Sequence, residues 1–560
     1  MKTINKIFTG IGLLAMSASF ASCVGDLDVP PKDPNKLTPE VFAQDPDGYL
    51  DRGIAEVMQG ATTAGPWGPG NSMLGFGDAG AGTFTRTVFN IEEMSTDNYS
   101  WLQFADAGYY ELVTMNLAPD NEIMYINYSR LYGIIALANQ FIRTVESGAY
   151  LTEQSAERAQ RAADYVRQAK VMRGLAYYYA LSAYGNIGYI DETAPSGTTP
   201  PQYTREEAFN LIVSSLEQVS EEWGNTYQVP AYGYVGKEAC DALLTRFYLN
   251  AATWIGTPMY DKCWTLCQKI IANHSGGVDN SGLAQSYKAL FGANNYEYAS
   301  QGARENEIIW TLPQNGMSLQ SYGNSTFYIA TVCGSYDGIS SVGDCNLNAQ
   351  WTCMVARQQL SEMFNFDRDG YTQDLRAELW KTSKDGFEIG NSTIMGNAGY
   401  GKGYAPIKFT NFAYDEWGNI DSAASPSSSN TFADADWPEI RLAEIYLNAV
   451  EAQVLGGAGS QSDALKYINF IRTRAGVDPW GVADLTAANV LTERDRELYG
   501  ENDRRTSLIR HGKYAGGAYL WNWKGGTHDG TATPEYMNLF PIPTKVISFS
   551  KYKQNPGYTK

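Results

Sequence analysis

Aromatic side chains in irregular segments are the residues of this sequence whose types best suit ligand binding. The chain of 560 residues has 38 Tyr, 21 Phe and 13 Trp. Many of them lie in two stretches, mainly residues 60–120 and 314–430, that are rich in Gly, Asn, Ser and Thr and show little helical or strand period. Because no core periodicity demands aromatic rings there, we interpret these stretches as an irregular binding lobe.

Groups that could perform catalysis are present, but the sequence does not arrange them in a catalytic motif. With 61 Asp and Glu residues, a carboxylate pair for glycoside hydrolysis stays an open alternative, although no pair stands out. His274, His511 and His528 lie far apart and outside any HExxH or triad context. We therefore predict a protein that is not an enzyme and that needs no cofactor.

One acidic segment deserves comparison with a calcium-binding loop. "DRDGYTQDLRAE", residues 367–378, has acids at loop positions 1, 3 and 12, but Tyr371 occupies position 5 and the glycine stands at position 4 instead of 6. This pattern favours a loop that precedes a helix over a calcium site. We predict no metal site.

The cysteines divide into one at the amino-terminal leader and six in the body. Cys263 and Cys267 are four residues apart on a predicted helix, so they share a face and are interpreted as buried thiols. Cys333, Cys345 and Cys353 fall in a loop-rich region where one disulfide can form, and the sequence leaves the pairing open. The sixth is Cys240.

The first residues indicate export. Lys2 and Lys6 precede an apolar run over residues 7–20, which is too short to span a bilayer. The following Ser-Phe-Ala-Ser-Cys resembles a bacterial lipoprotein box. It predicts a signal peptide over residues 1–22, a lipid on Cys23 and a polar tether over residues 23–34 that holds a single folded body, residues 35–560, at a membrane surface. The alternative is an ordinary signal peptide with an incidental cysteine.

Charge and composition narrow the class of ligand. The net charge is −19, and loss of the leader with its two lysines makes it more negative, which disfavours nucleic acid and anionic membrane surfaces. A hydrophobic fraction of 44% supports a substantial core. Neutral or cationic ligands remain.

Helical periodicity predicts the frame that must position the lobe. Apolar residues that recur every three or four positions predict helices over residues 155–185, 206–223, 237–254 and 260–272. A further helix is predicted in "WPEIRLAEIYLNAVEAQVLGG", with Pro438 in its first turn and Gly456 and Gly457 at its end. Helix pairs of this size resemble tetratricopeptide-type hairpins, although the sequence has no strict 34-residue repeat. The scaffold is placed mainly in residues 125–275 and 437–515.

Charged pairs on these helices have a structural interpretation. Arg441 and Glu444 are three residues apart, and Arg494 and Glu497 repeat the spacing. We predict local surface pairs or clamps between helices, without a functional role.

Five segments carry a family resemblance: "RGLAYYYALSAYGNIGYI", "RLAEIYLNAVEA", "INFIRTRAG", "ERDRELYGENDRRTSLIRHGKY" and "LFPIPTKVISFSKYKQNPGY". In this order they resemble the SusD/RagB family of outer-membrane lipoproteins. The resemblance implies a mostly α fold with four tetratricopeptide-like hairpins. It also implies a surface-exposed, lipid-anchored, non-catalytic glycan-binding protein that passes oligosaccharides to a SusC-like TonB-dependent transporter.

Within the family, "AYLWNWKGGT" and "AQWTCMVAR" are most similar to the starch-binding archetype. That similarity implies an aromatic arc containing Trp351 and either Tyr328 or its neighbour Phe327, which would cup a curved α-glucan. Arg86 in "FTRTVFN" matches a position that binds sugar hydroxyls, and Trp101 matches one archetype tryptophan.

Two departures from the archetype affect the expected sugar. Gln103 replaces a second stacking tryptophan, and Asp106 replaces a sugar-binding asparagine. A fructan or another neutral oligo- or polysaccharide is therefore the alternative to starch.

Each of these residues also has a structural interpretation. Trp351 can be a core tryptophan, Trp101 can plug the scaffold, and Arg86 can form an ion pair with Glu92 or Glu93. At the level of the whole protein, an adhesive surface protein that docks a partner is a further alternative.

Overall fold

The computed structural model describes residues 45–62, 80–103, 106–148, 155–336, 339–342, 345–365, 372–381 and 405–559. The predicted signal peptide, the lipidated Cys23 and the tether lie outside the described residues, as do residues 63–79 and 382–404 of the predicted lobe. Residues 366–371, which hold the first half of the acidic loop, lie outside them as well. Predictions on these segments stay predictions.

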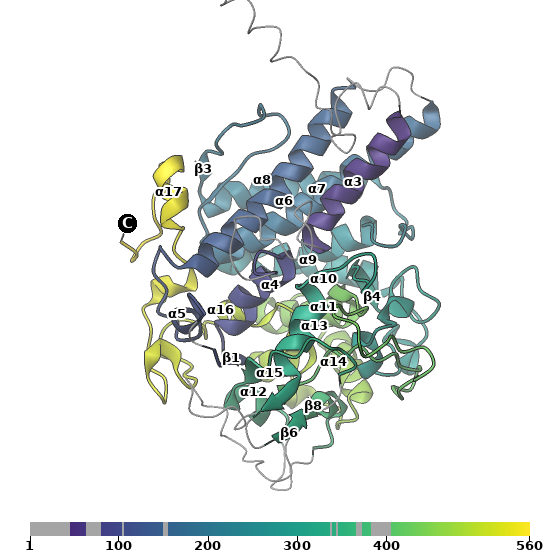
Figure 1. The fold of residues 1–560 in the computed structure, drawn as a ribbon, viewed down its shortest axis with the longest axis vertical. Helices are drawn as coiled ribbons and strands as arrows, with labels where there is room; N and C mark the ends of the chain where they lie inside the picture. The colour runs from purple at the N-terminus through teal and green to yellow at the C-terminus, as the bar shows by residue number, and fades with distance from the viewer. Residues whose placement is uncertain are drawn as a thin grey trace, which may run out of the picture.

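Helices build most of the regular structure, as the sequence predicts (Figure 1). In chain order they are α3 (Pro46–Thr62), α4 (Phe84–Phe89), α5 (Tyr109–Val113), α6 (Glu122–Glu146), α7 (Ala156–Tyr184), α8 (Arg205–Glu222), α9 (Lys237–Ile255), α10 (Tyr260–Ile271), α11 (Asn324–Val332), α12 (Gln358–Glu362), α13 (Leu442–Gly456), α14 (Gln461–Arg474), α15 (Ala487–Leu498), α16 (Arg504–Arg510) and α17 (Thr544–Ser550). Helix α6 packs on α7, α8 on α9, and α10 on α9 and α13. The four helices predicted between residues 155 and 272 are confirmed as α7 to α10.

The ends of α7 follow from its local sequence. The Ser155 hydroxyl accepts a hydrogen bond from the backbone N–H of Arg158 (3.1 Å), which satisfies a free donor of the first turn. Gly185, with a φ of 66°, ends the helix in the left-handed region that glycine adopts without strain. The predicted apolar stripe is buried along its length: Val166, Ala169, Met172, Ala176 and Tyr179.

The segment before α13 differs from the prediction. The sequence placed Pro438 in the first turn of a helix, but Trp437–Arg441 form strand β10, which pairs antiparallel with β4 (Ile308–Leu312). Every residue of β10 is buried, so pairing with a distant strand outweighs the local helical pattern. Helix α13 ends where the two glycines predicted, with Gly457 at a φ of 70°.

Short antiparallel pairs tie the irregular segments together in the described part of the chain. Besides β4 with β10, these are β1 (Tyr99–Trp101) with β7 (Met354–Ala356), β2 (Ile187–Gly188) with β3 (Gln202–Tyr203), β5 (Gly334–Tyr336) with β6 (Ile339–Val342), and β8 (Trp380–Lys381) with β9 (Ala405–Pro406). The β1–β7 pair sets Trp101 opposite Met354. It therefore places two predicted site segments side by side, although they are far apart in the sequence.

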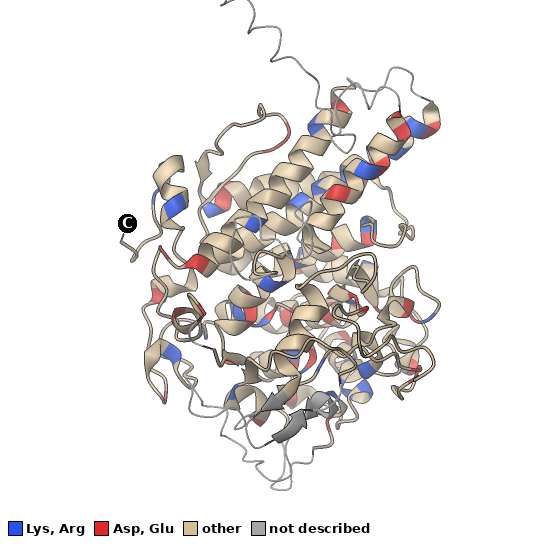
Figure 2. Ribbon diagram, in the orientation of Figure 1, with Lys and Arg blue, Asp and Glu red and all other residues tan. Residues whose placement is uncertain are grey.

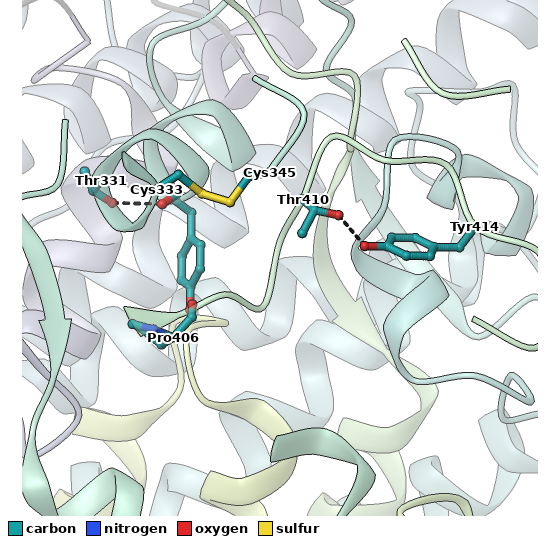
Figure 3. The surroundings of a disulfide bond; sticks show 7 residues. Thr331, Cys333, Cys345, Pro406, Thr410 and Tyr414 are labelled. Carbon is teal, nitrogen blue, oxygen red and sulfur yellow. Dashed lines mark hydrogen bonds between the residues drawn. A yellow bond between two sulfur atoms is a disulfide. The ribbon is translucent and has the colours of Figure 1, made fainter. Parts of the chain in front are cut away.

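The cysteine pairing that the sequence left open is Cys333 with Cys345, joined by a disulfide next to the end of α11 (Figure 3). The Thr331 hydroxyl donates to the backbone oxygen of Tyr328 (2.9 Å), and Thr410 hydrogen-bonds to Tyr414 (2.7 Å) in the same region. Cys263 and Cys267 are buried thiols, as predicted, and Cys240 is a third. The disulfide closes a loop within the segment that connects α11 to Trp351.

The i,i+3 spacing of Arg441 and Glu444 does not produce a surface pair, and that interpretation is wrong. Arg441 is buried and contacts Glu307 (2.8 Å), Glu497 (3.1 Å) and Glu501 (2.6 Å). Glu444 instead binds Arg246 of α9 (2.7 Å). The spacing puts the two side chains in different directions because β10 ends at Arg441 before α13 begins.

Arg494 and Glu497 also bind other partners. Arg494 contacts Asp503 (2.6 Å) and Glu451 of α13 (3.1 Å). Figure 2 shows basic and acidic residues side by side among the carboxy-terminal helices. The alternative prediction, clamps between helices, is what the Glu444–Arg246 and Arg494–Glu451 contacts show.

The described residues contain neither a membrane-spanning helix nor a metal-binding cluster. None of their helices has the length and apolar character needed to cross a bilayer. No group of three or more His, Cys, Asp and Glu side chains among them is arranged to hold a metal ion. In the described half of the acidic loop, the Asp374 carboxylate binds Arg376 (2.6 Å).

Candidate functional site

A cavity of about 430 Å³ brings together five of the seven residues predicted for the site. It is lined by residues of α4, β1, α5, the first turns of α6 and the segment that leads into β7. The predicted residues that line it are Arg86, Trp101, Gln103, Asp106 and Trp351. The volume lies within the range of small-molecule sites in proteins.

Trp351 is the predicted aromatic that keeps part of its surface open to the cavity. Its backbone N–H donates to the Ala330 oxygen of α11 (2.6 Å), which fixes the chain at this point. Its ring packs against Tyr322 with centroids 6.2 Å apart. The side chain is only partly buried, so it does not have the environment of a core tryptophan.

Trp101 is held differently. It is 3% exposed, lies parallel to Tyr109 at 4.3 Å, and has the ring of Phe327 nearly parallel to it at 6.2 Å. Its indole Nε1 donates to Asp106 Oδ2 (2.8 Å). Most of the ring therefore serves packing, as the plug interpretation predicted, and only a small part of its surface reaches the cavity.

Asp106 and Gln103 supply polar groups at the same wall. Both side chains are partly exposed. The indole of Trp101 orients the Asp106 carboxylate, and an ionised carboxylate has acceptor sites left for further donors such as hydroxyl groups.

Arg86 is 3% exposed and extends from α4. Its Nη2 donates to the Tyr109 hydroxyl (3.3 Å), and its guanidinium lies 4.8 Å from the centroid of Phe327. Glu92 accepts hydrogen bonds from Thr506 and Ser182, and Glu93 accepts one from Asn98. These two contacts of Arg86 are with aromatic side chains, whereas Glu92 and Glu93 bind other residues.

Phe327 and Tyr328 do not line the cavity, which corrects the expectation that one of them faces a ligand. They lie on α11 with 1% and 0% of their surface exposed. The Tyr328 hydroxyl donates to the Pro406 oxygen (2.8 Å), and burial raises the pKa of this phenol. Phe327 instead packs against the ring of Trp101 and the guanidinium of Arg86, outside the cavity lining. Phe327 and Tyr328 belong to an apolar helix that is buried along its length. The family resemblance could not reveal this burial.

Asn90, Tyr109 and Glu122 are among the lining residues that were not predicted from the sequence. Asn90 is 4% exposed, and its Oδ1 has no hydrogen-bond partner within the described part of the chain. A signal for Asn90 existed, because it follows Arg86 by four residues on one helical run and so shares its face. It also begins the π-helical turn Asn90–Met94, a feature frequent at functional sites. Tyr109 and Glu122 carried no such signal.

The arrangement suits recognition of a ligand with a flat apolar face and a polar fringe. The partly exposed ring of Trp351 offers the apolar contact, whereas the guanidinium of Arg86, the amide of Asn90 and the carboxylate of Asp106 offer planar polar groups. Arg86 and Asn90 are held by packing, so ordering them costs little further entropy.

Comparison with known proteins shows which proteins this chain resembles. The model of the SusD family matches residues 368–558. The starch-binding protein SusD of Bacteroides thetaiotaomicron is 29% identical over an alignment that covers 100% of this chain and 99% of that protein. A SusD-like protein of Bacteroides ovatus is 24% identical over 72% of this chain and 69% of its own length.

Solved structures show the same fold. A SusD superfamily protein from Bacteroides vulgatus has a TM-score of 0.65 at 19% identity and covers 92% of this chain and 99% of its own. Surface glycan-binding protein A from Bacteroides thetaiotaomicron, solved with laminarihexaose, has a TM-score of 0.65 at 18% identity and covers 91% and 99%. The family match, the full-length similarity and the shared fold together show that this chain is similar to proteins of the SusD family over its whole length.

Proposed function

We propose that the chain is a lipid-anchored protein of the bacterial cell surface that captures a neutral glycan in the cavity at Trp351 and passes it to a TonB-dependent outer-membrane transporter. The observation that carries the proposal is the convergence of Trp351, Arg86, Asn90 and Asp106 on one cavity. The family supports it, since the full-length relative from Bacteroides thetaiotaomicron is named for starch binding.

The chemistry of a pyranose ring matches this wall. One face of the ring is a C–H surface that packs on a flat aromatic side chain, and its equatorial hydroxyls both donate and accept hydrogen bonds. Trp351 receives the C–H surface in this proposal. Arg86 donates to hydroxyl oxygens, Asp106 accepts from hydroxyl protons, and Asn90 does either.

A starch-like α-glucan is the favoured ligand, with a fructan or another neutral glycan as the alternative. The relative named for starch favours the α-glucan, whereas a protein of the same fold was solved with laminarihexaose. Trp351 is the one aromatic residue among the described lining residues that is more than slightly exposed. We therefore infer that the site binds a short stretch of glycan.

Location and partner are proposed on other grounds. The lipoprotein box at Cys23 supports an anchor in the outer membrane, and the family resemblance supports a SusC-like transporter as the partner that the helical scaffold contacts. A protease-accessibility assay on intact cells, with Cys23→Ser as the non-lipidated control, tests the location. Protection of the wild-type protein from added protease would contradict surface display.

Titration calorimetry and affinity gels with amylopectin, laminarin, levan, inulin and mannan test the binding. We expect retention by at least one of them and loss of about 2 kcal/mol or more of binding free energy in Trp351→Ala. Trp417→Ala is the matched control, because Trp417 is 68% exposed and lies outside the cavity.

Equal binding by Trp351→Ala and the parent would remove Trp351 from the site. The same incubations, assayed for new reducing ends, test the non-catalytic part of the proposal. Release of reducing ends from the retained polysaccharide would favour the glycoside hydrolase alternative.

A further inference from the structure

A second cavity lies on the helical scaffold, away from the candidate site. Its volume is about 890 Å³, and it is lined by residues of α3, the first half of α7, the end of α8 and the loop 226–236 that leads into α9. It shares no lining residue with the cavity at Trp351. In Figure 1, α3 and α7 occupy the upper part of the molecule, above α4, α5 and β1.

Three half-buried aromatic rings line this second cavity. The rings of Tyr165 and Tyr234 are nearly parallel, at 20° with centroids 6.0 Å apart. The Tyr165 hydroxyl donates to Asp51 Oδ1 (3.0 Å), and the Trp223 indole Nε1 donates to Asp164 Oδ1 (2.6 Å). Hydrogen bonds thus hold two of the rings in place, so a ligand that packs on them orders few additional torsions.

Four charged residues beside these rings, Asp51, Arg161, Asp164 and Arg167, have charged partners, whereas Glu157 and Glu222, which also line the cavity, are exposed. Asp164 also accepts from Gln168 (2.8 Å) and from Arg167 (3.3 Å), whose guanidinium lies 5.6 Å from the Trp223 ring centroid. Arg161 binds Asp47 and lies 3.6 Å from Asp51. Figure 2 shows both signs of charge together at this end of α3 and α7.

This pairing has a consequence for the ligand. Beside the rings, an anionic or a cationic ligand would have to compete with an existing partner for each of the four paired groups, whereas a hydroxyl group can share their remaining acceptor and donor sites. The wall therefore favours a neutral ligand that carries many hydroxyl groups beside an apolar face.

We propose that this cavity is a second carbohydrate-binding site, which takes a neutral pyranose unit against Tyr165, Tyr234 and Trp223. The rings supply the apolar contact, and Asp164, Arg167 and Gln168 supply planar polar groups for the hydroxyls. The ligand class is that of the proposed function, but the residues are different. Two weak sites on one chain raise the avidity for a polysaccharide that reaches both.

Tyr234→Ala tests the second site, and Tyr234→Phe is its matched control because it keeps the ring. Each is compared with the parent, with Trp351→Ala and with the Trp351→Ala/Tyr234→Ala double variant in affinity gels that contain amylopectin, laminarin, levan, inulin or mannan. Melting temperatures confirm folding of every variant. We expect roughly tenfold weaker retention by Tyr234→Ala, parental retention by Tyr234→Phe, and weaker retention by the double variant than by Trp351→Ala.

The outcomes separate the two sites. Parental retention of Tyr234→Ala on every polysaccharide that the parent binds overturns the second site, whatever Trp351→Ala does. Loss of retention in Tyr234→Ala, together with parental retention in Trp351→Ala, supports the second site and overturns the assignment of the first. Retention of the parent by none of the five polysaccharides overturns both.

Discussion

At the scale of single residues, Asp106 connects the aromatic and the polar parts of the candidate site. Its carboxylate accepts the indole N–H of Trp101, which is itself packed against Tyr109. The remaining acceptor sites of the carboxylate are on the cavity wall. Asp106 therefore both orients a buried indole and offers an acceptor to the ligand.

Substitution of Asp106 should separate these two roles. Asp106→Ala leaves the indole N–H of Trp101 without its acceptor and removes the ligand contact, so we expect about tenfold weaker glycan binding by titration calorimetry. Asp106→Asn keeps a planar oxygen acceptor and should bind nearly as well as the parent. Parental affinity in Asp106→Ala would show that neither role contributes to binding.

At the scale of elements, α11 acts as the support of the site. It carries Phe327 beneath Trp101 and Arg86. Its carbonyl oxygens accept from the backbone N–H groups of Trp351 (2.6 Å) and Cys353 (2.9 Å). The Cys333–Cys345 disulfide follows directly after the helix and restrains the return of the chain to Trp351.

Loss of this disulfide should lower both stability and affinity. The two cysteines are 12 residues apart, and closure of a loop of this size contributes about 3 kcal/mol to the free energy of unfolding. We expect the Cys333→Ser/Cys345→Ser variant to lose stability of this order in urea denaturation and to bind glycan more weakly.

Reductant provides the control for the disulfide prediction. Under reductant the parent should fall to the value of the double variant, whose own stability should not change. A double variant that is as stable as the oxidised parent would show that this disulfide does not restrain the unfolded chain.

At the scale of the whole molecule, buried charges join segments that are far apart in the sequence. Arg441 binds Glu307 from the segment before β4 and Glu497 and Glu501 from the region of α15. Removing one member of such a group leaves an uncompensated buried charge, which is strongly destabilising. These contacts hold the helical scaffold and the irregular segments in one arrangement.

Another buried carboxyl makes stability depend on pH. Asp436 precedes β10, and burial raises its pKa from 3.8 to about 7 despite the hydrogen bonds donated by Tyr232 and by the backbone of Gln314. Between pH 4 and pH 7 the folded chain therefore holds a proton that the unfolded chain releases. Through this group, the free energy of unfolding falls as the pH rises through that window.

The substitution Asp436→Asn should remove this contribution. The amide keeps an oxygen for the N–H of Gln314 and cannot ionise, so we expect the melting temperature of the variant, relative to the parent, to be higher at pH 8 than at pH 5. Thermal melts at both pH values measure the difference. A relative melting temperature that is the same at both values would contradict a protonated Asp436 in the folded chain.

The sequence by itself determined the helices whose signals are local. The stripe of α7, the serine that begins it and the glycines that end α7 and α13 all act within a few residues, so periodicity and capping chemistry were sufficient to predict them. The family resemblance added the site segments, because it compares residue types and needs no contacts.

Only the tertiary structure decided which side chains meet. The β1–β7 pair brought Trp101 beside the segment of Trp351, burial of α11 took Tyr328 out of the site, and pairing with β4 made a strand of the segment around Pro438. Each of these outcomes depends on contacts between segments that are far apart in the chain. No pattern within one segment records such contacts, since their free energy comes from surface buried and hydrogen bonds made between distant partners.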